Sequence, residues 1–258
     1  MKKFLKIIAL TILTVLVLVI GVLGQPTFTF TGNEFTKNDY STILADNVSG
    51  NPLVTDIALL AAHDTLSEAI TRSSKPSVGG ALASDSLKFW TDTGIFQGAV
   101  GGFIARNSIA QKSEVYPLLT HGVRYLDIRI AEHDGEWYGC HGLLAAPIDG
   151  FLTDTIRFLS ETTGEFVVVE LRHTYFETVG YYELFEYIAS VKYEGKSLLD
   201  YVRYDKYDTP LEELRYNDAV NGGSGVIFVM REGPTCMVIG ILEDEEGNTI
   251  STIIDWGG

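Results

Sequence analysis

Two histidines, two aspartates and one arginine fall within or just after apolar stretches, where side chains of these types can carry acid–base chemistry. His63 and Asp64 directly follow an apolar run, Asp127 and Arg129 lie inside another, and His141 comes a short turn later. Histidine exchanges a proton near neutral pH, and a guanidinium can bind two oxygens of an anionic group. These five residues are our candidate catalytic site.

The segment 125–130 has the composition of a buried strand, because β-branched and aromatic residues surround its two charges. Residues i and i+2 of a strand point to the same side, so Asp127 and Arg129 point together. Charged side chains inside an apolar segment must be paired with an opposite charge or serve in binding or catalysis. A buried ion pair alone seldom stabilises a core, which favours a functional role for Asp127 and Arg129.

Predicted strands and helices alternate along the chain. We expect strands at 56–62, 125–130, 166–171 and 225–230, a C-terminal hairpin at 237–254, and helices at 82–91, 104–113, 114–121, 148–159 and 181–191. Strands that are apolar on both faces and alternate with helices predict a parallel sheet covered by helices. Polar residues at the carboxyl ends of these strands are typical of a β/α barrel. The predicted fold class is therefore α/β, with a distorted TIM-type β/α barrel.

The N-terminus predicts export. Lysines at positions 2, 3 and 6 precede an uncharged run that ends at Gly24, which is the pattern of a secretory leader and is long enough to cross a bilayer. A cleaved signal peptide and a retained anchor both remain open, and either places the catalytic domain outside the cytoplasm. We assign 1–24 to this leader, 25–52 to a spacer or N-terminal cap, and 53–258 to one barrel domain.

Charge and cysteine content exclude several functions. The 258-residue chain has a formal net charge of -15, so its surface repels nucleic acid and anionic lipid headgroups. Any membrane contact would therefore be apolar or tethered. Cys140 and Cys236 are compatible with one disulfide or with two buried thiols. No spacing of cysteines and histidines indicates structural zinc.

Four blocks in this order resemble a known family, the catalytic X domain of phosphatidylinositol-specific phospholipases C in its bacterial form. The resemblance covers about residues 53–232, and its blocks are Ala61-Ala-His-Asp-Thr-Leu-Ser67, Gly122-Val-Arg-Tyr-Leu-Asp-Ile-Arg129, His141-Gly142 and Glu165-Phe-Val-Val-Val169.

The resemblance implies a distorted barrel that cleaves an inositol phospholipid at a membrane surface to diacylglycerol and a cyclic inositol phosphate. It implies that His63 is the general base, that His141 is the general acid and that Asp64 supports His141. Arg129 would stabilise charge on the phosphate, with Asp127 holding it in place.

The same resemblance bears on cofactors and substrate contacts. Eukaryotic members carry an acidic residue at the position of Arg129 and bind calcium there, whereas the guanidinium here would repel a cation. We therefore expect no cofactor and no metal. Arg172 and Arg231 match positions that face the inositol ring, and Asp255 matches an inositol-binding aspartate.

The chain departs from the family at its C-terminal end. Family members have another barrel strand, which carries the aspartate that orients the base histidine, and this sequence stops at Gly258. We therefore expect a barrel that is incomplete there, or one that closes differently with Asp205 or Asp255 orienting His63.

Two other functions remain as alternatives. One is a metal-dependent glycerophosphodiester phosphodiesterase, although such enzymes carry His-Arg-Gly and Glu-x-Asp where this chain has His63-Asp64 and Asp127-x-Arg129. The other is a catalytically inactive surface protein that binds inositol lipids. No obligate protein partner is implied.

Overall fold

The computed structural model describes residues 39–77, 97–176, 180–204, 210–232, 235–243 and 249–254. The side chains of residues 97–100 and 231–254 are outside this description. The predicted leader, the helix expected at 82–91, Asp205 and Asp255 therefore lie outside the described residues. Within the described residues, no helix is long and apolar enough to cross a membrane.

Eight strands form one mixed sheet. They are β1 (Leu60–Ala62), β2 (Val123–His133), β3 (Glu136–His141), β4 (Leu143–Pro147), β5 (Phe166–Tyr175), β6 (Gly225–Glu232), β7 (Thr235–Glu243) and β8 (Thr249–Ile254). The order is β4-β3-β2-β5-β6-β7-β8, and β1 also pairs with β2. The pairs β1–β2, β2–β5 and β5–β6 are parallel, whereas the hairpins at both ends are antiparallel.

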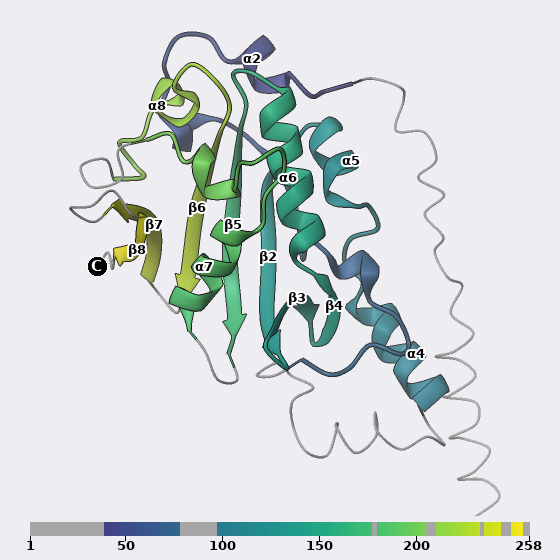
Figure 1. Ribbon diagram of the computed structural model, residues 1–258. Coiled ribbons are helices and arrows are strands. Elements are labelled where there is room, and N and C mark those ends of the chain that lie inside the picture. Colours follow the sequence, from purple (N-terminus) through teal and green to yellow (C-terminus); the bar gives the residue numbers. More distant parts are fainter. Residues whose placement is uncertain are drawn as a thin grey trace, which may run out of the picture. The chain divides into compact units, whose positions relative to one another are not determined.

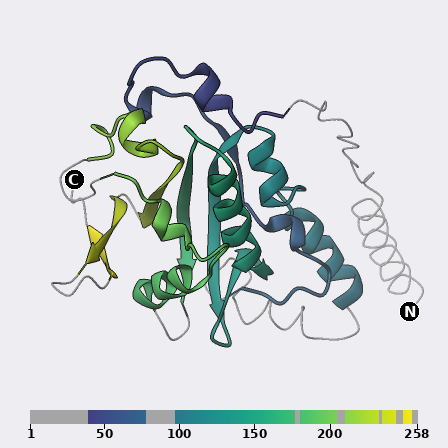
Figure 2. The same cartoon turned by 45° about the horizontal axis from the view of Figure 1, so that its top comes forward.

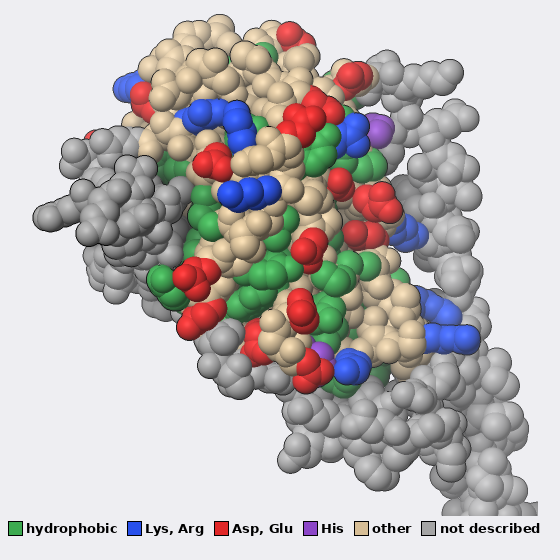
Figure 3. Space-filling view, viewed as in Figure 1, with side chains coloured by type: hydrophobic (Ala, Val, Ile, Leu, Met, Phe, Trp, Pro, Cys, Tyr) green, Lys and Arg blue, Asp and Glu red, His purple; other side chains and the backbone are tan. Residues whose placement is uncertain are grey.

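Helices connect the parallel strands and cover one face of the sheet. Figure 1 shows α6 and α7 lying across β2, β5 and β6, and the turned view in Figure 2 agrees. The described helices are α2 (Ile43–Asn47), α4 (Gln97–Ser108), α5 (Val115–Thr120), α6 (Asp149–Glu161), α7 (Tyr181–Ser190) and α8 (Tyr216–Val220), with 3-10 turns at Val54–Asp56, Ser67–Ala69 and Leu198–Tyr201. The outer surface on this side carries scattered acidic side chains (Figure 3).

The face under α6 and α7 is apolar along the middle of the strands. Alternate residues of the three central strands pack there against the helices. They are Leu126, Ile128, Ile130, Val167, Val169, Leu171, Val226, Phe228 and Met230, and all are buried.

The opposite face changes character along the strands. Near the amino ends of β5 and β6 it is apolar, where Phe166, Val168 and Ile227 pack against the 211–220 region. Toward the carboxyl ends, Asp127 and Glu170 are register partners on β2 and β5, and both are buried. This change from apolar to charged residues marks the candidate site. It lies at the carboxyl ends of the strands, where β/α folds have their active-site residues.

A buried ion pair ties the N-terminal segment to the other end of β2. Arg124 Nε lies 2.7 Å from Glu165 Oε2, and both side chains are excluded from solvent. The guanidinium also donates to the carbonyls of Tyr40 and Ser41, while Glu165 accepts from the amide of Leu44. Because charges buried here each have hydrogen-bonding partners, segment 40–45 is fixed against the sheet.

The α/β class and the helix-covered parallel sheet are confirmed. The described strands form an open sheet, and no closed barrel is present among them. Several boundaries were wrong: β1 begins at Leu60 and is far shorter than the strand expected at 56–62, and Asp56 belongs to a 3-10 turn instead. The helix expected at 104–113 is α4, displaced toward the N-terminus. Strand β4 was not predicted. Cys140 is a buried free thiol.

Candidate active site

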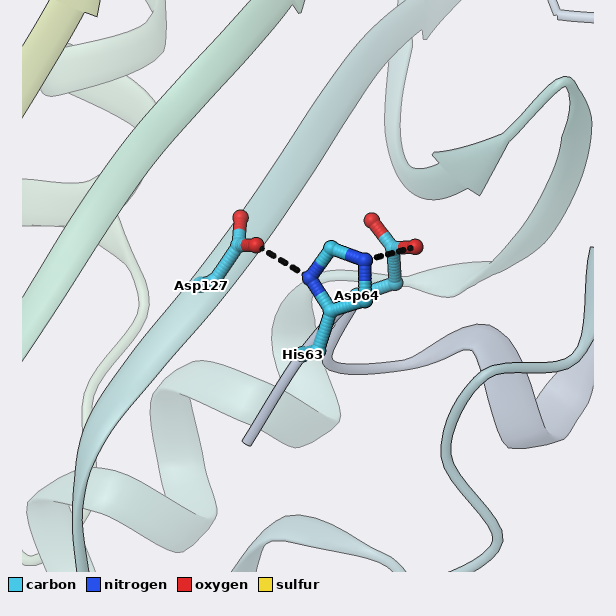
Figure 4. A group of neighbouring side chains, drawn as sticks. All are labelled: His63, Asp64 and Asp127. Carbon is cyan, nitrogen blue, oxygen red and sulfur yellow. Dashed lines mark hydrogen bonds and ion pairs between the residues drawn. The ribbon is translucent and has the colours of Figure 1, made fainter. Parts of the chain in front are cut away.

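His63 follows β1 and lies between two carboxylates (Figure 4). Its Nδ1 lies 2.7 Å from Asp127 Oδ2, and its Nε2 lies 3.2 Å from Asp64 Oδ2. The ring is 60% exposed, whereas the carboxylate of Asp64 is fully buried and that of Asp127 nearly so. An accessible imidazole is thus held by buried acidic groups, an arrangement that suits proton transfer to or from a bound molecule.

Asp64 connects the charged residues of the site. Its Oδ1 lies 2.7 Å from Arg129 Nε, and its Oδ2 lies 3.3 Å from His141 Nδ1 as well as near His63. The expected contact between Asp64 and His141 is therefore present. A buried carboxylate needs such partners, and three cationic or potentially cationic groups surround this one.

The loop that carries Asp64 has an unusual backbone. Asp64 has φ 48° and Leu66 has φ 78°, in the left-handed region that side chains other than glycine seldom adopt. Between them, the amide of Thr65 donates to the carbonyl of Asp127 at 2.8 Å. Strained backbone persists only where the surroundings hold it, so β2 fixes the direction in which Asp64 points.

His141 comes from the end of β3 and contacts the last residue of α4. Its Nδ1 lies 2.8 Å from the carbonyl oxygen of Ser108. A carbonyl can only accept, so Nδ1 carries a proton and Nε2 is the nitrogen left for a ligand. The side chain is partly exposed, as that of His63 is, so both rings are accessible from solvent.

Arg172 lies on the rim of the site. Its Nη1 is 3.6 Å from Asp127 Oδ2, and its side chain is 40% exposed. Two guanidinium groups thus oppose two buried carboxylates, Arg129 with Asp64 and Arg172 with Asp127. Both arginines keep nitrogen atoms beyond these contacts, which is what binding an anionic group requires.

Two further side chains border the same charges. Burial raises the pKa of the Cys140 thiol to about 12, while a hydrogen bond from Ser77 and the charge of Arg129 act against it. Burial likewise raises the pKa of Tyr175. Both groups are therefore neutral at physiological pH, and the ionic chemistry is confined to the histidines, aspartates and arginines.

One group of donors has the composition of a metal site. Single atoms of His63, Asp64 and Asp127 all lie within 4.8 Å of one another. Each carboxylate, however, already faces a guanidinium. A cation placed among them would lie close to two fixed positive charges, which opposes its binding.

The structure brings together six of the eight residues that the sequence singled out. They are His63, Asp64, Asp127, Arg129, Arg172 and His141. Arg231 lies in β6, but its side chain is outside the described part of the chain, as is Asp255 altogether.

The partners differ from those expected. Asp127 contacts His63 and Arg172, whereas Arg129 is held by Asp64 instead. The sequence interpretation missed the Ser108 carbonyl, because a backbone group leaves no signal in side-chain patterns. It also did not single out Glu170, the buried register partner of Asp127, although an acidic side chain in an apolar strand was a visible signal.

Comparison with curated proteins finds two phospholipase C-type relatives of this chain. The chain is 29% identical over 133 residues to the variant-surface-glycoprotein phospholipase C of Trypanosoma cruzi, which covers 49% of this chain and 34% of that protein. It is 27% identical over 161 residues to the PI-PLC X domain-containing protein 3 of Bos taurus, covering 55% of this chain and 44% of that protein. The chain is therefore similar to proteins of the PI-PLC X-domain family.

The chain spans less than half the length of the curated relatives it matches. No family model matches it. Among solved structures, a mutant phosphatidylinositol-specific phospholipase C from Staphylococcus aureus aligns with a TM-score of 0.48 and 16% identity, over 76% of this chain and 56% of that one. The enzyme from Listeria monocytogenes aligns with a TM-score of 0.39 and 15% identity, over 66% and 57%.

Proposed function

We propose that this protein is a phosphodiesterase that cleaves phosphatidylinositol, or a glycosylated inositol lipid, without a metal ion. One observation carries the proposal: His63 and His141 both contact Asp64, whose other oxygen pairs with Arg129. Two imidazoles and a guanidinium held by one buried carboxylate are the groups that phosphodiester cleavage by proton transfer needs. Similarity to PI-PLC X-domain proteins supports the substrate class.

The proposed reaction is an internal displacement at phosphorus. The inositol 2-hydroxyl gives its proton to His63 Nε2, and its oxygen bonds to phosphorus as the bond to the glycerol oxygen breaks. His141 gives a proton to that departing oxygen. The products are diacylglycerol and a cyclic inositol phosphate, so atoms and charge balance.

Each histidine has a partner that suits its role. Asp127, at 2.7 Å, fixes the His63 ring through Nδ1 and favours the charge that appears when Nε2 accepts a proton. The longer contact of Nε2 with Asp64, at 3.2 Å, is the one that the substrate hydroxyl replaces. The Ser108 carbonyl orients His141 in the same way.

Arg129 supplies the charge stabilisation in this proposal. Its Nε is occupied by Asp64, which leaves the outer nitrogens for the phosphate oxygens. Each proton transfer contributes roughly 10²–10⁴-fold in rate, and a fixed donor to the developing charge adds about 10²–10³-fold. Arg172, on the rim, contacts the inositol ring or its phosphate, with Arg231 and Asp255 as further substrate contacts.

The absence of a metal requirement is part of the proposal. Two guanidinium groups face the two carboxylates that a cation would need, and they supply the positive charge themselves. In this account the protein works as a metal-independent phospholipase C, the bacterial type that its sequence blocks resemble. The enzyme acts outside the cytoplasm on a membrane substrate, delivered there by its N-terminal leader.

The test is release of water-soluble cyclic inositol phosphate from phosphatidylinositol vesicles. We expect turnover by the full-length protein and a loss of at least about 10²-fold in His63→Ala and in His141→Ala. His121→Ala is the matched control, because His121 caps α5 at the other end of β2. Binding to the vesicles without turnover by the wild type would instead identify an inactive lipid-binding protein.

A metal-dependent glycerophosphodiester phosphodiesterase is the second candidate. The donor group of His63, Asp64 and Asp127 favours it, since these residues offer three ligand atoms within one small volume. Its activity would disappear with a chelator, and its substrate would be a glycerophosphodiester that lacks acyl chains.

A further inference from the structure

Gly139 lies in β3, two residues before His141, and faces the loop that follows His63. A Cβ atom at this position would lie 2.7 Å from the Cβ of Leu66 and 2.8 Å from its Cδ1. Non-bonded carbons pack at about 3.5–4.0 Å. No side chain fits at position 139 unless the strand or the loop moves.

Glycine is required here for space rather than for its backbone freedom. Gly139 pairs with Ile130 in extended conformation, and it is not among the glycines with positive φ. A glycine inside a strand often marks the close approach of another segment, and here that segment is the loop carrying Leu66.

Leu66 cannot move away from position 139 without displacing residues of the candidate active site. It is 5% exposed, with its backbone in the left-handed region. On one side the Thr65 amide is bonded to the Asp127 carbonyl. On the other, Ser67 Oγ accepts from the amides of Ala110 and Gln111 at 3.1 and 2.9 Å.

A shift of Leu66 therefore reaches both histidines. Through Thr65 it displaces Asp64 and His63. Through Ser67 it displaces residues 110–111, which directly follow the stretch whose Ser108 carbonyl contacts His141. Packed segments of this kind transmit strain because the interior has little empty volume.

We propose that Gly139 is a positioning residue of the active site. Its missing side chain lets β3 and the 63–67 loop approach closely enough for Asp64 to contact His63 and His141 at once. The effect on turnover rests on the proposed function, whereas the effect on histidine geometry does not.

The first test is Gly139→Ala in the full-length chain. A misplacement near 1 Å can cost about 10²-fold in rate, so we expect a fall of that order in kcat with a much smaller change in KM. Gly150→Ala is the matched control, because a Cβ at this exposed position in α6 meets nothing within 4 Å. It should leave kcat unchanged.

The second test is rescue from the other side of the contact. Leu66→Gly removes the Cβ that an alanine at position 139 would meet and suits the positive φ of this position, whereas Leu66→Ala keeps that Cβ. We expect Gly139→Ala to lower kcat about 10²-fold in the wild-type background and in the Leu66→Ala background. In the Leu66→Gly background, we expect it to lower kcat only about threefold or less. Such non-additivity is the signature of direct contact.

The third readout does not depend on turnover. The ring signals of His63 and His141 are followed by NMR, with His63→Gln and His141→Gln assigning them. We expect both signals to shift in Gly139→Ala and to return in Gly139→Ala/Leu66→Gly. Should Gly139→Ala not fold, Leu66→Ala loosens the same contact and is expected to move the same signals.

The proposal would be overturned if the histidine signals did not move in Gly139→Ala or in Leu66→Ala. It would also be overturned if Leu66→Gly did not restore the signals of Gly139→Ala. Signals that respond as expected in a wild-type protein without turnover would support the role of Gly139 while rejecting the phosphodiesterase. Turnover by the wild type with unresponsive histidine signals would support the phosphodiesterase and reject the role of Gly139.

Discussion

Asp127 Oδ2 lies 2.7 Å from Nδ1 of His63, so the aspartate of the central strand holds the accessible histidine of the site. The resemblance had left this role to Asp205 or Asp255, and to Asp127 it had given the task of holding Arg129. Instead, Asp64 holds Arg129. Each buried carboxylate therefore serves one histidine and one arginine, and Asp64 serves the second histidine as well.

Asp127→Asn tests whether this contact fixes the ring. The amide keeps the shape but loses the charge that holds the Nδ1 proton, so the imidazole can adopt the wrong tautomer, an effect worth about 10⁴-fold in serine proteases. We expect kcat on phosphatidylinositol vesicles to fall by at least about 10²-fold with the fold intact by circular dichroism. Asp134→Asn, at the exposed tip of the β2–β3 hairpin, should keep wild-type activity. A kcat close to wild type in Asp127→Asn would reject the role.

Arg129→Lys tests whether the guanidinium of Arg129 binds Asp64 and the substrate phosphate together. Lysine keeps the positive charge but cannot hold Asp64 and two phosphate oxygens at the same time. Removing one such donor costs about 10²–10³-fold in kcat, and we expect a loss within that range. Arg172→Lys, on the partly exposed rim, should mainly raise KM. Equal effects of both substitutions on kcat would contradict the separation of their roles.

Arg124→Met tests the buried ion pair at the opposite end of β2. Removing one partner leaves the buried Glu165 carboxylate uncompensated, which costs about 3–5 kcal/mol, and the carbonyls of Tyr40 and Ser41 lose their donor. We expect that decrease in the free energy of unfolding, measured with guanidinium chloride.

The matched control is Arg157→Met. Arg157 pairs with Glu161 one turn along α6 at 2.9 Å, and both side chains are exposed. Surface pairs of this kind contribute about 0.3–0.5 kcal/mol. A comparable loss of stability in the two variants would show that burial of the Arg124 pair is not what matters.

Cys140 should be inert although it adjoins His141. Burial raises the pKa of its thiol to about 12, which leaves roughly one thiolate in 10⁴ at pH 8, and the thiolate is the reactive form. In a Cys236→Ser variant, we expect a thiol reagent to label nothing in the folded protein at pH 8 and one thiol per chain in guanidinium chloride. Rapid labelling of the folded protein would contradict the burial of Cys140.

Much of the framework could be predicted from the sequence. The apolar composition of 125–130, 166–171 and 225–230 identified β2, β5 and β6, because a strand buried on both faces needs such a run. The i, i+2 spacing correctly placed Asp127 and Arg129 on one face. Strand β1 was harder, since Ile57 and Leu59 extend its apolar pattern although a 3-10 turn precedes them.

The pairing inside the site could not be predicted. Spacing shows which side chains share a face, but several charged groups on one face can pair in more than one way. The choice depends on the left-handed backbone of Asp64 and Leu66, which the residue types do not disclose. The contact of Gly139 with Leu66 joins segments that are far apart in the sequence, so only the folded chain reveals it.

The central claim is that two histidines and an arginine cleave the phosphodiester without a metal. The most direct measurement is ³¹P NMR of phosphatidylinositol vesicles incubated with the full-length protein in EDTA, and again with excess Ca²⁺ or Mg²⁺. We expect the signal of a cyclic phosphodiester to appear at the same rate in all three conditions. Activity that vanishes in EDTA and returns with a divalent cation would contradict the account and identify His63, Asp64 and Asp127 as metal ligands.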